Sequence, residues 1–153
     1  IRSNPWMRAL RCDKLTYAAL EATLRLYLDP GSLAEHLPVL GMMTATPAML
    51  RDRADGLLHE LDGLRVRGWQ IEVIDSIAQA GSGSLPLEEI PSVALRIGPT
   101  GLSSGELAAR LRQGQPAVVG YVRDDRLHLD LRTIAAAETQ DLVTALQRAA
   151  GLT

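Results

Sequence analysis

Three cationic residues at three-residue spacing stand near the beginning of the sequence. Arg8, Arg11 and Lys14 lie in the stretch NPWMRALRCDK, and Lys14 is the only lysine in the chain. Residues three apart share a face in a helical or near-helical turn. Two guanidinium groups on such a face can bind one phosphate or carboxylate through bidentate hydrogen bonds. The pattern therefore indicates a candidate anion-binding site.

A plainer interpretation is that these cations form the solvated start of a helix. Their charges would then pair with Asp13 or Glu21, and exposed pairs of this kind contribute little to stability. Cations near a helix N-terminus also oppose the helix dipole, however. This cost is a reason to look for an anionic partner, and the spacing alone leaves both interpretations open.

Two other groups of polar residues give weaker signals. The segment GSGSLPLEEIPS, residues 81–92, has small residues that leave backbone amides open to a ligand. It lacks the lysine end of a phosphate-binding loop, so a flexible link between strands is the alternative. The three histidines, His36, His59 and His128, have no spacing typical of a metal site, and we expect no metal.

The composition limits the kind of protein this can be. The chain has 153 residues, of which 46% are hydrophobic, and this suffices for one full core or two small subdomains. A net charge of −2 argues against a general polycationic surface for nucleic acid. The single cysteine, Cys12, fits a reducing compartment, and no apolar run is long enough to span a bilayer. We expect a cytoplasmic protein without a membrane partner, and the start at Ile1 suggests a piece of a longer chain.

Helices are expected to dominate the first part of the chain. Apolar residues recur at helical spacing from Asp13 to Leu28, and Asp13 is a plausible N-cap. A second helix is expected from Thr46, with Pro47 at its first position, to about Leu61. The stretch between the two helices, HLPVLGMMTATP, is expected to be an irregular apolar connection.

Strands are expected after Gly63. WQIEVIDSI and SVALRI have the composition of strands, and ELAARLRQG is a helix that ends at Gly114. AVVGYVR and RLHLDLRTI form a hairpin through Asp124 and Asp125, followed by a helix over Gln140–Ala149. The fold class is therefore α/β of the α+β type, in which N-terminal helices precede a small, mostly antiparallel sheet covered by helices. We place the domain boundary between residues 1–62 and 63–153.

Four stretches together resemble one family. The chain resembles the C-terminal part of bacterial selenocysteine synthases, the L-seryl-tRNA(Sec) selenium transferases, which are fold-type I pyridoxal-phosphate enzymes. The resemblance covers nearly the whole chain in order. The segments that carry it are NPWMRALRCDKLTYAALEATLRLYLDP, LPVLGMMTATPAMLRDRA, GSGSLPLEEIPSVALRI and LAARLRQGQPAVVGYVRDDRLHLDLRTI.

The resemblance implies a reaction and an architecture. Family members hold pyridoxal phosphate on a lysine of a large domain and convert seryl-tRNA(Sec) to selenocysteinyl-tRNA(Sec) with selenophosphate. Residues 1–62 would then be linking helices from the large domain, and residues 63–153 would be the small C-terminal domain. The resemblance also implies a homo-oligomer. The cofactor lysine would lie upstream of this chain, because Lys14 does not occupy its position, so we expect the fragment alone to be inactive.

The resemblance also assigns roles to individual residues. Arg8 and Arg11 match the two arginines of the family's RALR motif, which implies that they hold the anionic selenium donor or a phosphate. Arg132 ends a predicted strand where fold-type I enzymes commonly bind a carboxylate, but a structural role or a tRNA phosphate is the alternative. Cys12 departs from the family pattern, and we expect it to fill a buried spot.

Two other functions stay open at this stage. One is a related pyridoxal-phosphate lyase of the same superfamily that acts on a small amino acid. The other is a non-catalytic oligomerisation module, which has no need of the missing lysine.

Overall fold

The computed structural model describes residues 4–79 and 89–152. The chain forms two compact units, Ile1–Thr44 and Ala45–Thr153, and each is described by itself below. The glycine-rich part of the predicted 81–92 loop, up to residue 88, lies outside the described residues. None of the described helices is long and apolar enough to cross a membrane.

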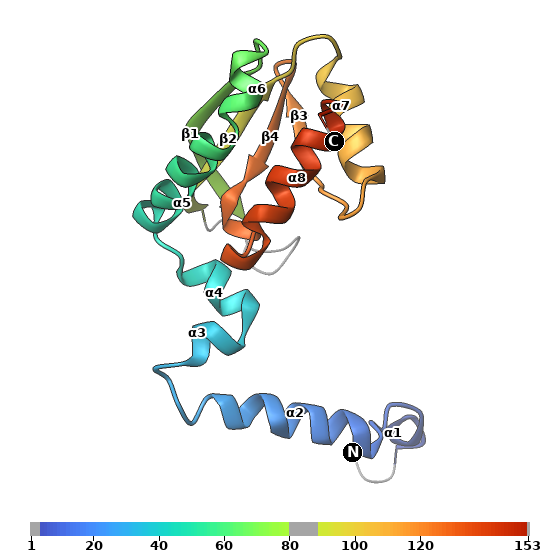
Figure 1. The fold of residues 1–153 in the computed structure, drawn as a ribbon. Coiled ribbons are helices and arrows are strands. Elements are labelled where there is room, and N and C mark those ends of the chain that lie inside the picture. Colours follow the sequence, from blue (N-terminus) through green and yellow to red (C-terminus); the bar gives the residue numbers. More distant parts are fainter. Residues whose placement is uncertain (1–3, 80–88, 153) are drawn as a thin grey trace. The chain divides into compact units, whose positions relative to one another are not determined.

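The first unit is helical. It contains α1 (Trp6–Ala9), α2 (Lys14–Leu26), α3 (Leu33–His36) and α4 (Pro38–Thr44) (Figure 1). The long helix predicted from Asp13 is confirmed as α2. The expectation of an irregular connection before Thr46 is wrong, because α4 occupies most of it.

A glycine explains how the two short helices α3 and α4 approach each other. A Cβ atom at Gly41 would lie only 2.8 Å from the backbone oxygen of Ala34. Any other residue type at this position would therefore push α4 away from α3.

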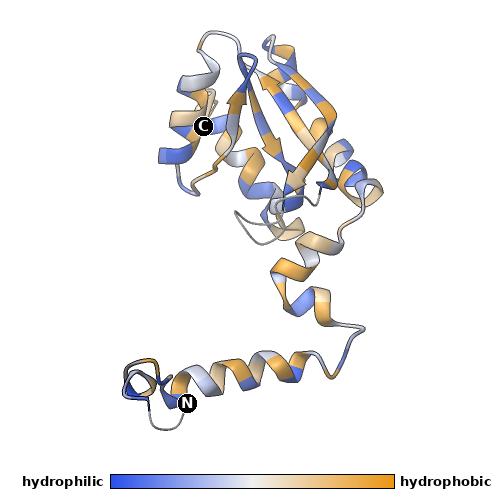
Figure 2. Cartoon of the chain, turned by 180° about the vertical axis from the view of Figure 1, so that it is seen from behind, coloured by the Kyte–Doolittle hydropathy of each residue, from blue (hydrophilic) through white to orange (hydrophobic). Residues whose placement is uncertain are grey.

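The described residues of the first unit include none that is buried. Apolar residues recur along α2 among polar ones, as the orange bands in Figure 2 show. A set of large apolar side chains is exposed along α1 and α2, namely Trp6, Met7, Leu10, Leu15, Tyr17, Leu20, Leu24, Tyr27 and Leu28. An amphipathic helix of this length derives its stability mainly from packing of its apolar face, so α2 carries a face suited to contact with further protein.

The second unit combines a four-stranded antiparallel sheet with helices. The strands lie in the order β1-β2-β4-β3, which confirms the predicted fold class. The elements of this unit in chain order are α5 (Pro47–Glu60), α6 (Asp62–Val66), β1 (Gln70–Gln79), β2 (Glu89–Gly98), α7 (Ser104–Gln113), β3 (Tyr121–Arg123), β4 (Arg126–Asp130), two 3-10 turns (Leu131–Thr133 and Ala136–Glu138) and α8 (Thr139–Ala149).

One face of the sheet forms the core with α5, α7 and α8. Apolar rows cross the strands: Val73 pairs with Leu95, which pairs with Leu129, and the next row joins Ile71, Ile97 and Leu127. The helices contribute buried residues at helical spacing, which in α5 are Leu50, Ala54 and Leu57. These residues belong to one hydrophobic cluster with the buried residues of α7 and α8 (Figure 1).

Local capping sets the beginnings of α5 and α7. The Thr46 hydroxyl accepts a hydrogen bond from the backbone N–H of Met49 at 3.3 Å, and Pro47 stands in the first turn of α5. Ser103 and Glu106 form a reciprocal capping box at the start of α7. The predicted second helix therefore begins where its sequence signals place it.

The predicted hairpin is confirmed. Asp124 and Asp125 connect β3 to β4 with φ angles of 50° and 53°. Two successive residues with positive φ form the type I′ turn that matches the twist of antiparallel strands. Aspartate tolerates this backbone region better than most residues, so the two aspartates suit the turn.

The compact unit begins earlier than the expected domain boundary. The sequence placed this boundary between residues 62 and 63, whereas the second unit starts at Ala45. The reason is that α5 buries its apolar face in the same cluster as the sheet. As a statement about domains of a longer protein, the boundary at residue 62 stays a prediction.

Candidate anion-binding site

Arg8, Arg11 and Lys14 do not lie on one continuous helix. Arg8 belongs to α1, which ends at Ala9, and Lys14 is the first residue of α2. Arg11 lies in the connection between the two helices. The shared helical face expected from the spacing is therefore interrupted, because Asp13 adopts an extended backbone to cap α2. All three cationic side chains are exposed.

The two carboxylates that were expected to pair with these cations have other partners. Asp13 accepts hydrogen bonds from the Thr16 backbone N–H at 2.8 Å and from the Thr16 hydroxyl at 3.0 Å. These bonds hold the pKa of the Asp13 carboxyl below its usual value. Glu21 instead pairs with Arg25, with 2.7 Å between Oε1 and Nη2.

The cations are consequently left with unused binding capacity. Within the described part of the chain, no ion pair involves Arg8, Arg11 or Lys14. Each guanidinium carries five N–H donors in a planar arrangement that matches a phosphate or carboxylate. The stretch can therefore bind an anion without first breaking a salt bridge.

Cys12 lies beside these cations. Its thiol is exposed in the structure, so the expectation of a buried position is not met within this chain. The reason is local, because the connection between α1 and α2 belongs to a unit whose described residues include none that is buried.

Arg132 has a different environment from Arg8 and Arg11. The sequence placed Arg132 at the end of a strand, whereas it lies in the 3-10 turn after β4. The reason is that the Asp130 side chain accepts a hydrogen bond from the Arg132 backbone N–H at 2.9 Å and caps that turn. Its side chain is only 6% exposed and donates to the backbone oxygens of Ala45 at 2.8 Å and Pro91 at 2.5 Å. This geometry favours the structural alternative for Arg132.

The three histidines are scattered. His36 ends α3, and the Nδ1 atom of His59 lies 2.8 Å from the backbone oxygen of Asp55. The buried His128 ring stacks on Tyr121, with 5.0 Å between ring centroids. Among the residues that the structure describes, no group of histidine, cysteine and acidic residues is arranged to hold a metal ion.

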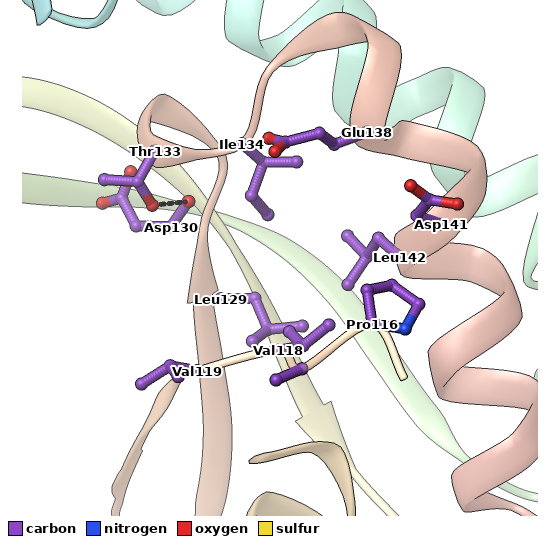
Figure 3. Close-up of a pocket in the computed structure, with 11 residues that line it drawn as sticks. Pro116, Val118, Val119, Leu129, Asp130, Thr133, Ile134, Glu138, Asp141 and Leu142 are labelled. Atoms are coloured by element: carbon purple, nitrogen blue, oxygen red, sulfur yellow. Dashed lines mark hydrogen bonds between the residues drawn. The ribbon is translucent and has the colours of Figure 1, made fainter. Parts of the chain in front are cut away.

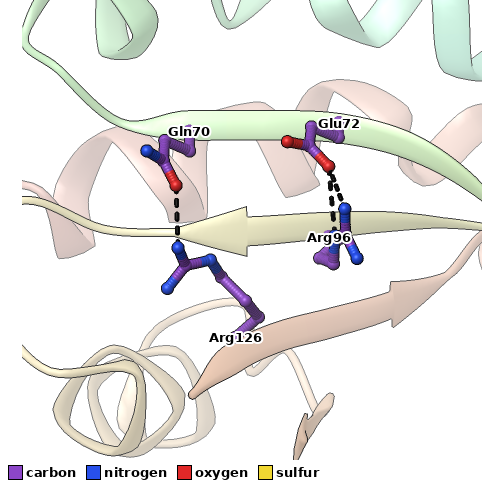
Figure 4. A network of polar contacts seen from close by, with 4 residues as sticks. All are labelled: Gln70, Glu72, Arg96 and Arg126. Atoms are coloured by element: carbon purple, nitrogen blue, oxygen red, sulfur yellow. Dashed lines mark hydrogen bonds and ion pairs between the residues drawn. The ribbon is translucent and has the colours of Figure 1, made fainter. Parts of the chain in front are cut away.

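The sheet face opposite the core carries a polar network that the sequence did not predict. Glu72 on β1 pairs with Arg96 on β2, and Arg126 on β4 donates to the Gln70 side chain at 2.8 Å (Figure 4). Arg126 reaches β1 across Gly98, where a Cβ would lie 2.7 Å from its Nε. The alternation of polar and apolar residues along the strands is the signal that could have identified this face.

A second polar cluster lies on the same face. The Asp130 carboxylate accepts hydrogen bonds from the hydroxyls of Ser76 and Ser92, each at 2.7 Å. The Arg132 backbone N–H is a third donor to this carboxylate. The Asp130 carboxylate thereby links β1, β2 and the end of β4.

One pocket of the second unit is acidic. It has a volume of about 220 Å³ and lies where the segment before β3 separates from β4. Glu138 and Asp141, both near the start of α8, contribute carboxylates, and apolar side chains such as Leu129 and Ile134 line the interior (Figure 3). Two carboxylates beside an apolar interior repel an anion, so this pocket is unsuited to the reactant expected for Arg8 and Arg11.

Comparison with known proteins identifies the family. The family model described as L-seryl-tRNA selenium transferase matches residues 1–135. The chain belongs to the L-seryl-tRNA selenium transferase family. The match includes both the stretch with Arg8 and Arg11 and most of the sheet unit, so the resemblance seen in the sequence is confirmed.

Individual relatives of the family agree along the chain. The L-seryl-tRNA(Sec) selenium transferase of Nitratidesulfovibrio vulgaris is 39% identical over 152 residues, which cover 99% of this chain and 32% of the relative. The enzyme of that name from Haemophilus influenzae is 42% identical over 140 residues, which cover 91% of this chain and 30% of the relative. The Salmonella typhimurium enzyme is 44% identical over 137 residues, which cover 88% of this chain and 30% of the relative. The chain thus spans about a third of the length of these transferases.

Proposed function

We propose that this chain forms part of a pyridoxal-phosphate-dependent selenium transferase, which converts seryl-tRNA(Sec) to selenocysteinyl-tRNA(Sec) with selenophosphate. In this proposal, Arg8 and Arg11 bind the anionic selenium donor. The observation that carries it is the pair of exposed guanidiniums whose neighbouring carboxylates are occupied elsewhere, in a chain whose relatives bear the transferase name. The proposal includes a cytoplasmic location, because the substrate is an aminoacyl-tRNA.

The residues of this chain do not by themselves suit pyridoxal phosphate. The cofactor needs a lysine amine in a protected site, and the only lysine, Lys14, is exposed at the start of α2. We therefore assign cofactor binding to a part of the enzyme other than these residues and derive no step of the reaction through the cofactor.

The role left to this chain is electrostatic and positional. Selenophosphate is a small polyanion, and two guanidiniums can hold its oxygens by charge-assisted hydrogen bonds while its selenium stays free to react. Bound in this way, the donor loses translational freedom before the chemical step, which raises its effective concentration. The guanidiniums also stabilise negative charge on the phosphate that leaves.

The first unit supports a second, compatible role. The exposed apolar residues of α1 and α2 suit contact with further protein, either the rest of the transferase or another subunit of a homo-oligomer. A purely non-catalytic oligomerisation module would use these residues but would leave Arg8 and Arg11 without function. A lyase acting on a small amino acid is less well supported, because the relatives named above are all transferases.

A chimeric enzyme tests the proposal. Residues 1–153 would replace the aligned third of the Nitratidesulfovibrio vulgaris transferase, with which they share 39% identity. We expect the chimera to form selenocysteinyl-tRNA from seryl-tRNA(Sec) and selenophosphate. A chimera that folds and binds both substrates but transfers no selenium would contradict the proposal, and the unmodified parent enzyme is the control.

A further inference from the structure

A second cationic site lies in the sheet unit, at the C-terminal ends of α7 and α8. A pocket of about 290 Å³ opens there, and its polar lining consists of Arg110, Gln113, Gln115 and Arg148. The described residues that line it include no aspartate or glutamate. The pocket therefore offers guanidinium and amide donors without a competing acid, in contrast to the acidic pocket at the start of α8.

Both guanidiniums in this pocket are held in place by the backbone. Arg110 Nη1 donates to the Ala149 backbone oxygen at 2.9 Å, and Arg148 Nη1 donates to the Gln115 backbone oxygen at 2.8 Å. No ion pair involves either arginine in the part of the chain that the structure describes. Each group therefore keeps most of its five donors for a ligand, and ordering it for binding costs little entropy.

The local charge balance is positive. The C-terminal ends of α7 and α8 each contribute about half a negative charge, which two guanidiniums more than offset. Glu106 is the acidic residue closest along α7, one turn before Arg110. Its carboxylate is held by the Ser103 backbone N–H and hydroxyl and does not line the pocket, although its charge acts on Arg110. The pocket lining and the two helix ends together carry about one positive charge.

We infer that this pocket binds a phosphate group of an RNA backbone. The inference rests on the proposed function, because the relatives' printed names supply the tRNA. Two guanidiniums and two amides match the oxygens of one phosphodiester, while the pocket offers no aromatic platform for a base. The contact is thus independent of nucleotide sequence and positions the RNA on the sheet unit.

A direct test follows the two arginine side chains during titration. The probes are a 12-base-pair RNA hairpin and, separately, inorganic phosphate, added to the ¹⁵N-labelled 153-residue chain. We expect the hairpin to shift the Nε–H NMR signals of Arg110 and Arg148 but not that of Arg112, an exposed arginine on the same helix outside the pocket. If inorganic phosphate shifts these signals and the hairpin does not, the assignment to RNA is wrong. If neither probe shifts them, the pocket is not a binding site.

Matched variants make the test quantitative. Replacing Arg110 and Arg148 together by glutamine should weaken hairpin binding about tenfold. The plot of log K against log salt should also become less steep by about one unit, which corresponds to the loss of one phosphate contact. Arg112→Gln, which removes one positive charge at an exposed arginine outside the pocket, is the control, and an equal loss there would contradict the site.

A further variant guards against unfolding of the double variant. Gln115→Glu places a carboxylate in the pocket while both arginines and the Gln115 backbone oxygen remain, and it should also weaken hairpin binding. Unchanged binding in this variant would refute the inference. Hairpin binding is measured without selenium transfer. A wrong RNA inference can therefore be distinguished from a wrong assignment of Arg8 and Arg11 to the selenium donor.

Discussion

At the scale of single residues, arginines of this chain have opposite environments. Arg8 and Arg11 are exposed in the described structure and have no ion pair there. Arg132 is buried, and its guanidinium bonds backbone oxygens contributed by Ala45 and Pro91. The residue type is visible in the sequence in each case, but only the structure shows which guanidinium is buried and which is exposed.

Replacing Arg132 by alanine should destabilise the sheet unit strongly. The Ala45 and Pro91 oxygens would lose their guanidinium donors, and hydrogen bonds that involve a charged group contribute about 1.5–3 kcal/mol. We expect the free energy of unfolding from urea titration to fall by about 3 kcal/mol. Arg123→Ala, at an exposed arginine beside Asp124, should change it by less than about 0.5 kcal/mol. Equal effects of the two substitutions would contradict the structural role.

At the scale of elements, the start of α7 depends on the ionised state of Glu106. The Ser103 backbone N–H and then its hydroxyl lower the pKa of the Glu106 carboxyl, and Arg110 lowers it further. A carboxyl whose pKa is lower in the folded state stabilises the protein above its unfolded pKa of about 4.3. That stabilisation is lost as the pH falls through the lower, folded-state pKa.

Glu106→Gln should therefore differ from the wild type in a pH-dependent way. The melting temperature of the wild type should exceed that of the variant at pH 7, and the difference should shrink as the pH falls from about 5 toward 3. Ser103→Ala, which removes one of the two donors, should show a weaker dependence. A difference that stays constant across this range would show that the capping carboxylate does not stabilise α7.

Elements with strong local signals could be predicted from the sequence. Asp13 and Thr46 cap α2 and α5 as expected, and Asp124 with Asp125 forms the expected turn. Short helices escaped prediction, because α3 and α4 have too few turns to show a periodic apolar pattern. The strand β4 was predicted too long, because Leu131 continues the apolar alternation although Asp130 already caps a 3-10 turn.

The candidate site could be predicted only in part. The types and spacing of Arg8 and Arg11 are visible in the sequence, but the break between α1 and α2 that interrupts their helical face is not. The pocket at Arg110 and Arg148 joins residues far apart in the chain. These residues come together only because the fold places the C-terminal ends of α7 and α8 side by side, so no local sequence pattern could have indicated the pocket.

At the scale of the whole molecule, stability and the candidate donor site belong to different units. The hydrophobic cluster begins at Ala45 and includes residues of the second unit alone, within the part that the structure describes. Arg8 and Arg11 belong to the first unit, whose described residues include none that is buried. Folding of the sheet unit should therefore be independent of the residues that carry the candidate site.

The fragment 45–153 should fold without the first 44 residues. We expect a single cooperative urea transition with a midpoint close to that of the whole chain, because no buried residue of the described core is removed. Far-UV circular dichroism and urea titration of both chains measure this. A fragment that is unfolded in buffer would contradict the division into two units.

The central claim is that Arg8 and Arg11 bind the selenium donor, and donor affinity in the chimeric transferase tests it most directly. Loss of a charge-assisted hydrogen-bonding group costs about 1.5–3 kcal/mol, so Arg8→Ala and Arg11→Ala should each weaken selenophosphate binding by about tenfold or more. Arg25→Ala, which removes an α2 arginine already paired with Glu21, should leave donor affinity unchanged. If donor affinity is the same in all three variants as in the unsubstituted chimera, Arg8 and Arg11 do not hold the donor.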